Sequence, residues 1–175
     1  PQDVALLYVC FRLRQLAVFG FMAIESIIFP KVFAANTRND MRETTYLIRL
    51  FTRTALGYAV CAVIGAGMIG PYVLAIFGDE FIKGQSILVL LFCTLIPRAM
   101  FGPASIILGM HRHTTLVAFI LGLSLIISLF LCFVGFQFGG LAMIAIGYLV
   151  ASLFTAIAMW YMAMRKSGIN CAIWA

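Results

Sequence analysis

Charged residues are scarce in this chain. Asp, Glu, Lys and Arg together make up 10% of its 175 residues, whereas about a quarter of the residues in a typical soluble domain are charged. Hydrophobic residues account for 64%, and the mean hydropathy is +1.10. A soluble domain of this size could not bury so much apolar surface. The composition therefore excludes a soluble protein and predicts that lipid is the solvent of this chain.

Residues that bind metals or perform catalysis are equally few. The chain has six acidic residues and two histidines, and it shows no nucleophile-and-base arrangement, nucleotide motif or set of metal ligands. The sequence predicts a protein that is not an enzyme and that needs no cofactor and no metal. Its five cysteines lack CxxC or metal-ligand spacing, and we interpret them as small buried hydrophobic residues; they are Cys10, Cys61, Cys93, Cys132 and Cys171.

The net charge of +6 does not indicate a nucleic-acid-binding protein. The basic residues lie between long apolar runs, as membrane topology requires, and form no continuous binding face. The chain begins at Pro1 and enters an apolar segment directly, without the charged region and cleavage site of a signal peptide. We therefore expect it to be a piece of a longer protein.

Five apolar stretches are long enough to cross a bilayer, which takes about 20 residues of helix. They cover residues 4–35, 54–76, 86–110, 115–135 and 139–164. The sequence thus predicts an all-α polytopic membrane protein with about five transmembrane helices. A basic amphipathic segment, residues 41–53, precedes the second span. Its arginines share one helical face, which indicates attraction to anionic lipid headgroups or contact with a substrate headgroup.

Basic residues mark every second connection between the predicted spans. They occur in residues 31–53, in the 110–114 connection and in the tail that starts with Arg165 and Lys166. The 77–85 connection carries Asp79, Glu80 and Lys83, and the 136–138 connection has no charge. The positive-inside rule places the basic connections in the cytoplasm. We therefore expect a multi-pass protein of the cytoplasmic (inner) membrane, with its amino end outside and its carboxyl end inside.

Arg98 is the strongest candidate for a functional residue. It lies about 12 residues from either end of the predicted 86–110 helix, near the bilayer midplane, where an arginine costs about 2.5–3.5 kcal/mol. Thr94 and Ser105 share its helical face, and Pro97 and Pro103 interrupt the helix. Two interpretations remain open. Arg98 either binds an anion in a central cavity or is a structural arginine, paired with an acid or with carbonyls that the prolines free.

Arg12 and Arg14 lie in the outer part of the first predicted span. If the span begins near them, both side chains reach the outer interface, and if it begins earlier, they line a cavity that is open to the outside. Tyr8, Arg12 and Gln15 share one helical face, because they are four and three residues apart. This face is a second candidate for contact with a substrate.

Glu25 is the only acid inside a predicted span. It shares a helical face with Arg14, because 11 residues make almost three turns. Such a carboxylate serves either as a proton or sodium relay or as the counter-ion of Arg98. A polar stripe on the last span is interpreted as serving packing or hydrogen bonding, with contact to a substrate as the alternative; it consists of Tyr148, Ser152 and Thr155.

The order of these features resembles one known family. A tyrosine-led helix that ends in a proline is followed by a basic segment, a glycine-acid-aromatic turn, a short basic loop and a glycine pair that opens the last helix. These motifs are residues 8–34, 40–53, 76–81, 108–112 and 138–142. Over residues 4–164, the chain resembles the polysaccharide-exporter branch of the multidrug/oligosaccharidyl-lipid/polysaccharide flippase superfamily.

The resemblance implies the second lobe of a two-lobe flippase. Such a protein moves lipid-linked oligosaccharides across the cytoplasmic membrane for polysaccharide and O-antigen export, by alternating access through a cationic cavity. Its implied partners are membrane lipid, the amino-terminal lobe of the same protein, and polymerase and chain-length proteins of polysaccharide assembly. Glu25 is the candidate for ion coupling, and the candidates for contact with the anionic headgroup are Arg98, Arg12, Arg14, Thr94 and Tyr8.

Three alternatives remain. An exporter of organic cations from the same superfamily would have to tolerate three arginines and one acid, which together repel a cationic cargo. A flippase for lipid-linked peptidoglycan precursors would use the same chemistry on another cargo. A membrane scaffold that recruits polymer-assembly enzymes belongs to a different class, and it would have no need of an arginine at the depth of Arg98.

Overall fold

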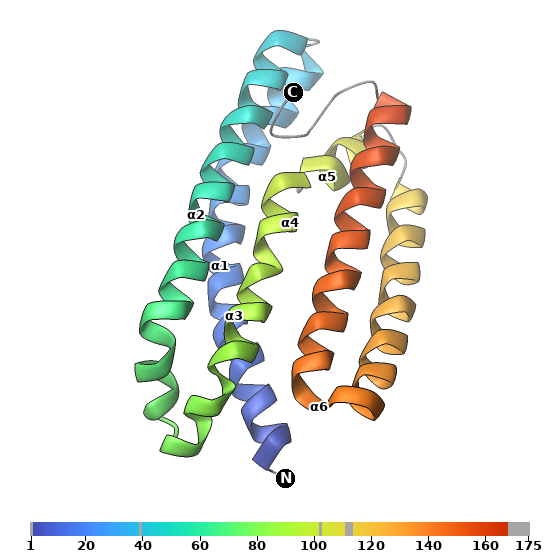
Figure 1. Cartoon of the computed structure of the whole chain (residues 1–175). Coiled ribbons are helices and arrows are strands. Elements are labelled where there is room, and N and C mark those ends of the chain that lie inside the picture. Colours follow the sequence, from blue (N-terminus) through green and yellow to red (C-terminus); the bar gives the residue numbers. More distant parts are fainter. Residues whose placement is uncertain (1, 39, 102, 111–113, 168–175) are drawn as a thin grey trace.

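The computed structural model describes residues 2–38, 40–101, 103–110 and 114–167, which are helical apart from short turns. Most of the helices run along one axis and form an elongated bundle, whereas α5 lies across one end of α4 (Figure 1). The elements are α1 (Gln2–Thr37), α2 (Met41–Ala75), the 3-10 helix η1 (Asp79–Gly84), α3 (Gln85–Cys93), α4 (Leu95–Phe101), α5 (Pro103–Met110) and α6 (Thr114–Ser167).

Five segments of the described chain are long and apolar enough to cross a membrane: Asp3–Thr37, Met41–Ala75, Asp79–Phe101, Thr114–Gln137 and Gly140–Lys166. Many large hydrophobic side chains on these segments point out of the bundle, as lipid contact requires. The predicted all-α polytopic fold is confirmed. The protein is a multi-pass membrane protein.

The basic segment 41–53 is the first part of the continuous helix α2. Asp40 caps this helix, because its carboxylate accepts hydrogen bonds from the backbone N–H groups of Arg42 and Glu43, which are otherwise unpaired at a helix start. One face of the segment is buried against the rest of the bundle, through residues that include Leu47 and Phe51. The arginines of the segment are exposed. Its apolar face therefore packs against the bundle and its basic face points outward.

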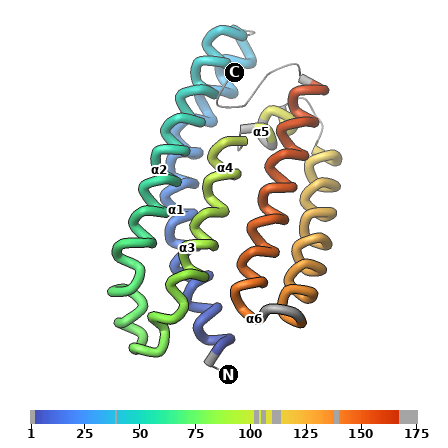
Figure 2. Tube along the Cα trace, in the orientation of Figure 1, coloured from blue at the N-terminus to red at the C-terminus, as the bar shows by residue number. Residues whose placement is uncertain are grey.

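The third span is broken close to its proline. Pro97 has no N–H and therefore cannot complete the helical hydrogen bond to the carbonyl four residues earlier. α3 ends at Cys93, and Thr94 bonds the Leu91 carbonyl through its own N–H and, at 2.6 Å, through its hydroxyl. α5 begins at Pro103, in the first helical position that suits proline, and runs in a new direction (Figure 2). The predicted 86–110 helix, which Pro97 and Pro103 were expected to interrupt, is divided into α3, α4 and α5.

The last two spans form a hairpin within α6. Gly140 has φ 67° and ψ −152°, a conformation that side chains with a Cβ rarely adopt, and the chain reverses there (Figure 2). The two halves approach closely because glycines lie between them. A Cβ added at Gly135 would be 2.9 Å from the carbonyl oxygen of Met143, and one at Gly147 would be 3.2 Å from the backbone of Leu131.

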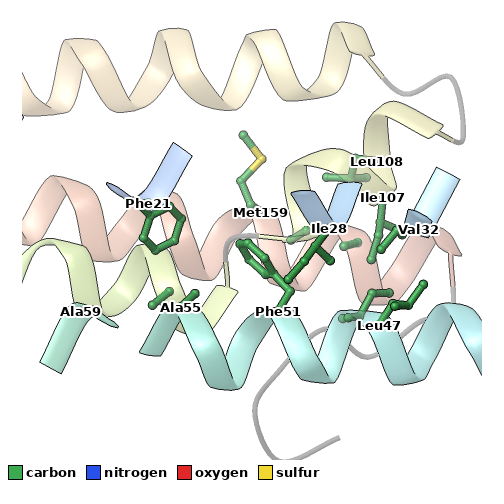
Figure 3. Packing of buried hydrophobic residues seen from close by; sticks show 14 of the residues in the cluster. Phe21, Ile28, Val32, Leu47, Phe51, Ala55, Ala59, Ile107, Leu108 and Met159 are labelled. Carbon is green, nitrogen blue, oxygen red and sulfur yellow. The ribbon is translucent and has the colours of Figure 1, made fainter. Parts of the chain in front are cut away.

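The buried side chains form two apolar clusters. The larger joins α1, α2, α4, α5 and α6, and Phe21, Phe51 and Met159 lie within it (Figure 3). The smaller joins α1, α2, α3 and α6, and it includes Cys10, Leu74 and Leu91. In three parts of the chain, a polar residue lies between the members of one cluster and those of the other. These residues are Arg14 in α1, Thr94 at the α3–α4 break and Ser152 in α6. Polar residues thus occupy the boundary between the clusters.

Candidate functional site

The polar residues at this boundary come from three parts of the bundle and form what we call the interior polar cluster. It consists of two contact groups. Arg14 of α1, Thr94 of the α3–α4 break, and Tyr148 and Ser152 of α6 form one group at the boundary. Arg98 of α4 and Glu25 of α1 form the other group, one helical turn further along α4 from Thr94. α1 presents residues 14, 21 and 25 on one face, since spacings of 7 and 11 residues are close to whole turns.

The depth of the cluster follows from its contact with the last span. The Ser152 hydroxyl donates a 3.4 Å hydrogen bond to the Thr94 carbonyl. Ser152 lies 12 residues after Gly140 and 14 before Lys166, which bound that span, so Thr94 lies near the middle of the bilayer. Arg98 follows one helical turn later, a rise of about 6 Å. It therefore lies deep in the membrane although α4 ends soon after it.

Arg14 is held by neutral groups. Its Nε–H donates a 2.9 Å hydrogen bond to the Thr94 hydroxyl, and its guanidinium carbon lies 4.9 Å from the centroid of the Tyr148 ring. The Thr94 side chain is almost completely buried and donates in turn to the Leu91 carbonyl, so its orientation is fixed. These contacts position the arginine and stabilise its charge through the ring face, but they do not neutralise it.

Arg98 has an acidic partner. Its Nη2 lies 3.4 Å from Glu25 Oε1, and its guanidinium carbon lies 5.1 Å from the centroid of the Phe21 ring. Phe21 and Glu25 are one turn apart on α1 and together flank the arginine. The ion pair is a single long contact and not a bidentate one, and 38% of the Arg98 side chain is exposed. The structure thus places Glu25 where the sequence allowed a counter-ion.

The interior polar cluster carries an unbalanced positive charge. Arg14 and Arg98 contribute two positive charges and Glu25 contributes one negative charge. Within the residues that the structure describes, the Arg98–Glu25 contact is the only ion pair, so Arg14 has no carboxylate partner there. The two guanidinium groups also repel each other. Because an unpaired charge in a medium of low dielectric is costly, the cluster favours an anionic ligand.

Tyr8 and Arg12 lie on a different face of α1. Arg12 Nε–H donates a 2.9 Å hydrogen bond to the Tyr8 hydroxyl, and both side chains are exposed. Arg12 and Arg14 are two residues apart, which turns their side chains by about 200° around the helix. The structure therefore brings Arg14, Thr94, Arg98 and Glu25 together and leaves Tyr8 and Arg12 outside the cluster. The side chain of Ser105 and residues 111–113 are outside the described part of the chain.

Sequence reasoning did not place α6 beside Arg14 and Thr94. It identified Tyr148 and Ser152 as part of a polar stripe and favoured packing or hydrogen bonding over contact with a substrate, and Ser152 does donate a hydrogen bond to the Thr94 carbonyl. The third member, Thr155, does bond within its own helix, to the Ala151 carbonyl. Periodicity showed that the three residues share a face, whereas the direction of that face depends on how α6 packs against α1 and the α3–α4 break.

Comparisons with protein-family models, with curated proteins and with solved structures find no match to this chain. The geometry and charge of the interior polar cluster are therefore the basis for a functional proposal.

Proposed function

We propose that this chain is one lobe of a flippase that moves a lipid-linked oligosaccharide across the cytoplasmic membrane. The observation that supports the proposal is the net positive charge of the interior polar cluster, in which Arg14 has only neutral partners among the residues that the structure describes. Ionisable residues inside membrane spans mark the paths of ions and substrates. Because the cluster has one more positive than negative charge, an anionic cargo would neutralise it.

The diphosphate of such a cargo is the group that needs a protein. Moving a charged phosphate through bare hydrocarbon carries a prohibitive desolvation cost, whereas the polyprenyl tail can stay in lipid throughout. Guanidinium groups offer paired donors that match phosphate oxygens. Thr94 engages the Nε of Arg14 and Tyr148 lies against its guanidinium, so no carboxylate among the described residues competes with a phosphate for this arginine. A phosphate can also replace Glu25 beside Arg98, because that ion pair is long and partly exposed.

Alternating access would come from a second lobe that rocks against this one. On this proposal the exposed part of Arg98 faces the cavity between the lobes. An exporter of organic cations would instead need a net negative charge at this depth, whereas two arginines and one acid leave the interior polar cluster positive. A scaffold without transport activity would have no use for the unpaired charge of Arg14.

The test is a translocation assay with the full-length protein in proteoliposomes, using a polyprenyl-diphosphate-linked oligosaccharide. We expect Arg14→Gln and Arg98→Ala to lower the initial rate by about tenfold or more, since a hydrogen bond to a charged group contributes about 1.5–3 kcal/mol. Arg98→Lys, which keeps the charge but not the paired donors, should retain an intermediate rate. Arg165→Gln on the exposed end of α6 is the matched control and should transport normally.

Three outcomes would change the proposal. If Arg14→Gln and Arg98→Ala fold and transport like the wild type, the interior polar cluster is structural and the headgroup passes elsewhere. If the protein moves organic cations and not the lipid-linked oligosaccharide, it belongs to the drug-efflux branch. If it moves neither, the scaffold interpretation is favoured.

A further inference from the structure

A groove of about 330 Å³ runs along the exposed face of α1, on a different side from the interior polar cluster. One part of its wall is polar and the rest is apolar, and Phe77, from the turn after α2, contributes to this wall. The residues that matter for its chemistry are Tyr8, Arg12, Gln15, Leu16, Phe19 and Phe77. The polar side chains share the face of α1 that the sequence indicated.

The depth of this groove in the membrane can be inferred from the elements that lie beside it at the same end of the bundle. Phe77 directly follows the C-cap of α2 at Ile76. The thiol of Cys10 lies 3.8 Å from the carbonyl oxygen of Gly84, which ends η1. η1 also carries Asp79 and Glu80, both exposed, and such acids mark the aqueous side of a membrane interface. The first part of the groove therefore lies at the interface.

The polar and apolar parts of the groove lie at different depths. Arg12 is two residues beyond Cys10, which is about 3 Å of helix. Leu16 and Phe19 are four and seven residues beyond Arg12, which takes them about 6 and 10 Å deeper into the hydrocarbon. A charge at the interface thus continues into an apolar channel that follows the membrane normal.

Arg12 is arranged to bind an anion at this level. Tyr8 accepts from its Nε at 2.9 Å, and the Tyr8 ring lies 5.0 Å below its guanidinium carbon. These contacts engage the Nε and one face of the guanidinium. Its terminal nitrogens have no hydrogen-bond partner among the described residues. Within the described residues Arg12 forms no ion pair. A positive charge at the interface without a carboxylate partner is complementary to a lipid phosphate.

We infer that this groove binds one phospholipid of the surrounding leaflet. The phosphate lies on the terminal nitrogens of Arg12, which bind phosphate oxygens in pairs. Gln15, which is three residues deeper than Arg12, faces the glycerol region, and one acyl chain lies along Leu16 and Phe19. The site is separate from the interior polar cluster, so its failure would leave the proposed function intact.

The experiment is native mass spectrometry of the full-length protein in detergent, with four added ligands. Phosphatidylglycerol and phosphatidylethanolamine carry both the phosphate and the chains. Diacylglycerol has the chains alone, and glycerol phosphate has the phosphate alone. We expect the two phospholipids to give a tightly bound single adduct and the other two ligands to give none. Arg12→Ala should weaken phosphatidylglycerol binding about tenfold, and Phe19→Ala should weaken it as well.

The controls separate a built site from general attraction. Lys83→Ala removes one exposed positive charge at the same end of the bundle and should leave the tight adduct unchanged. Arg12→Gln is the second variant if Arg12→Ala does not fold. Equal binding of diacylglycerol would overturn the inference in favour of a purely apolar groove, and equal binding of glycerol phosphate would reduce the site to a free-anion site. Wild-type affinity in both Arg12 variants would also overturn it.

Discussion

Glu25 and Arg98 neutralise each other inside the bundle. Their side chains meet at 3.4 Å, and 19% of the Glu25 side chain is exposed. Removing one partner leaves the other charge without compensation in a medium of low dielectric, which costs more than the pair itself contributes. Removing both restores neutrality. The two residues should therefore be coupled in stability, and this coupling is measurable separately from transport.

We predict that Glu25→Gln and Arg98→Gln each lower the thermal stability of the purified protein in detergent. The double variant Glu25→Gln/Arg98→Gln should lose less than the sum of the two, with a coupling energy of about 0.5–3 kcal/mol. Unfolding can be followed by the fluorescence of Trp160, which packs against Phe101 of α4. Glu43→Gln and Arg53→Gln, two exposed residues ten positions apart on α2, provide the control cycle and should be additive. Additive losses at the interior pair as well would show that the contact contributes no stability.

At this scale the sequence indicated ionisable residues inside the spans, and the Arg98–Glu25 pair was among its alternatives. Arg98 and Glu25 could be identified because ionisable residues inside apolar spans are rare. The separation of Arg12 from Arg14 could be expected from their spacing, but not which of the two faces the interior. α1 is apolar around most of its circumference, so no polar face indicated its orientation. Contact with Thr94 and Tyr148 is a property of the packing.

At the scale of elements, α1 and α2 are locked together by one close approach. The Tyr58 hydroxyl of α2 donates a 2.7 Å hydrogen bond to the Ala17 carbonyl of α1. This is possible because Gly20 has no Cβ, and a Cβ built there would overlap the Tyr58 ring. Small residues commonly allow helices to approach in this way in membranes.

Gly20→Ala should therefore destabilise the protein by about 1–3 kcal/mol, the usual cost of overpacking, as measured by thermal unfolding in detergent. Gly57→Ala is the matched control on α2, since an added Cβ there meets nothing within 4 Å and alanine favours a helix. Adding Tyr58→Phe to Gly20→Ala removes the overlapping oxygen and should recover part of the loss. An unchanged melting temperature for Gly20→Ala alone would mean that α1 and α2 separate at no cost.

The spans themselves could be predicted because the thickness of a bilayer fixes the length of apolar helix that it requires. Where a helix breaks is harder to predict. Pro97 was expected to interrupt its helix, yet the break falls three residues earlier, at Thr94. Pro97 has no N–H, so the carbonyl of Cys93 lacks its usual helical hydrogen bond. Whether α5 continues the axis of α4 or turns across it depends on the surrounding packing against Leu47 and Val32 (Figure 3), which no local pattern contains.

At the scale of the whole molecule, charge divides between the two ends of the bundle. The α1–α2 connection and the C-terminal end of α6 lie at the same end of the bundle (Figure 1). In sequence, the connection carries Arg38 and Arg42, and α6 ends with Arg165, Lys166 and Ser167. The opposite end holds the acidic helix η1 and the bend of α6, which has no charged residue beside it. Since cytoplasmic connections are enriched in lysine and arginine, the end with the α1–α2 connection should be cytoplasmic.

Cysteine labelling in membrane vesicles tests this orientation. In a background without native cysteines, Thr37→Cys and Glu43→Cys should react with a membrane-impermeant maleimide only in inside-out vesicles, and Asp79→Cys only in right-side-out vesicles. All three positions are exposed, so differences in labelling report the side of the membrane and not burial. The reverse pattern would show that this chain does not follow the positive-inside rule. It would also move the Arg12 groove to the cytoplasmic leaflet, so the same labelling decides which leaflet supplies the phospholipid proposed there.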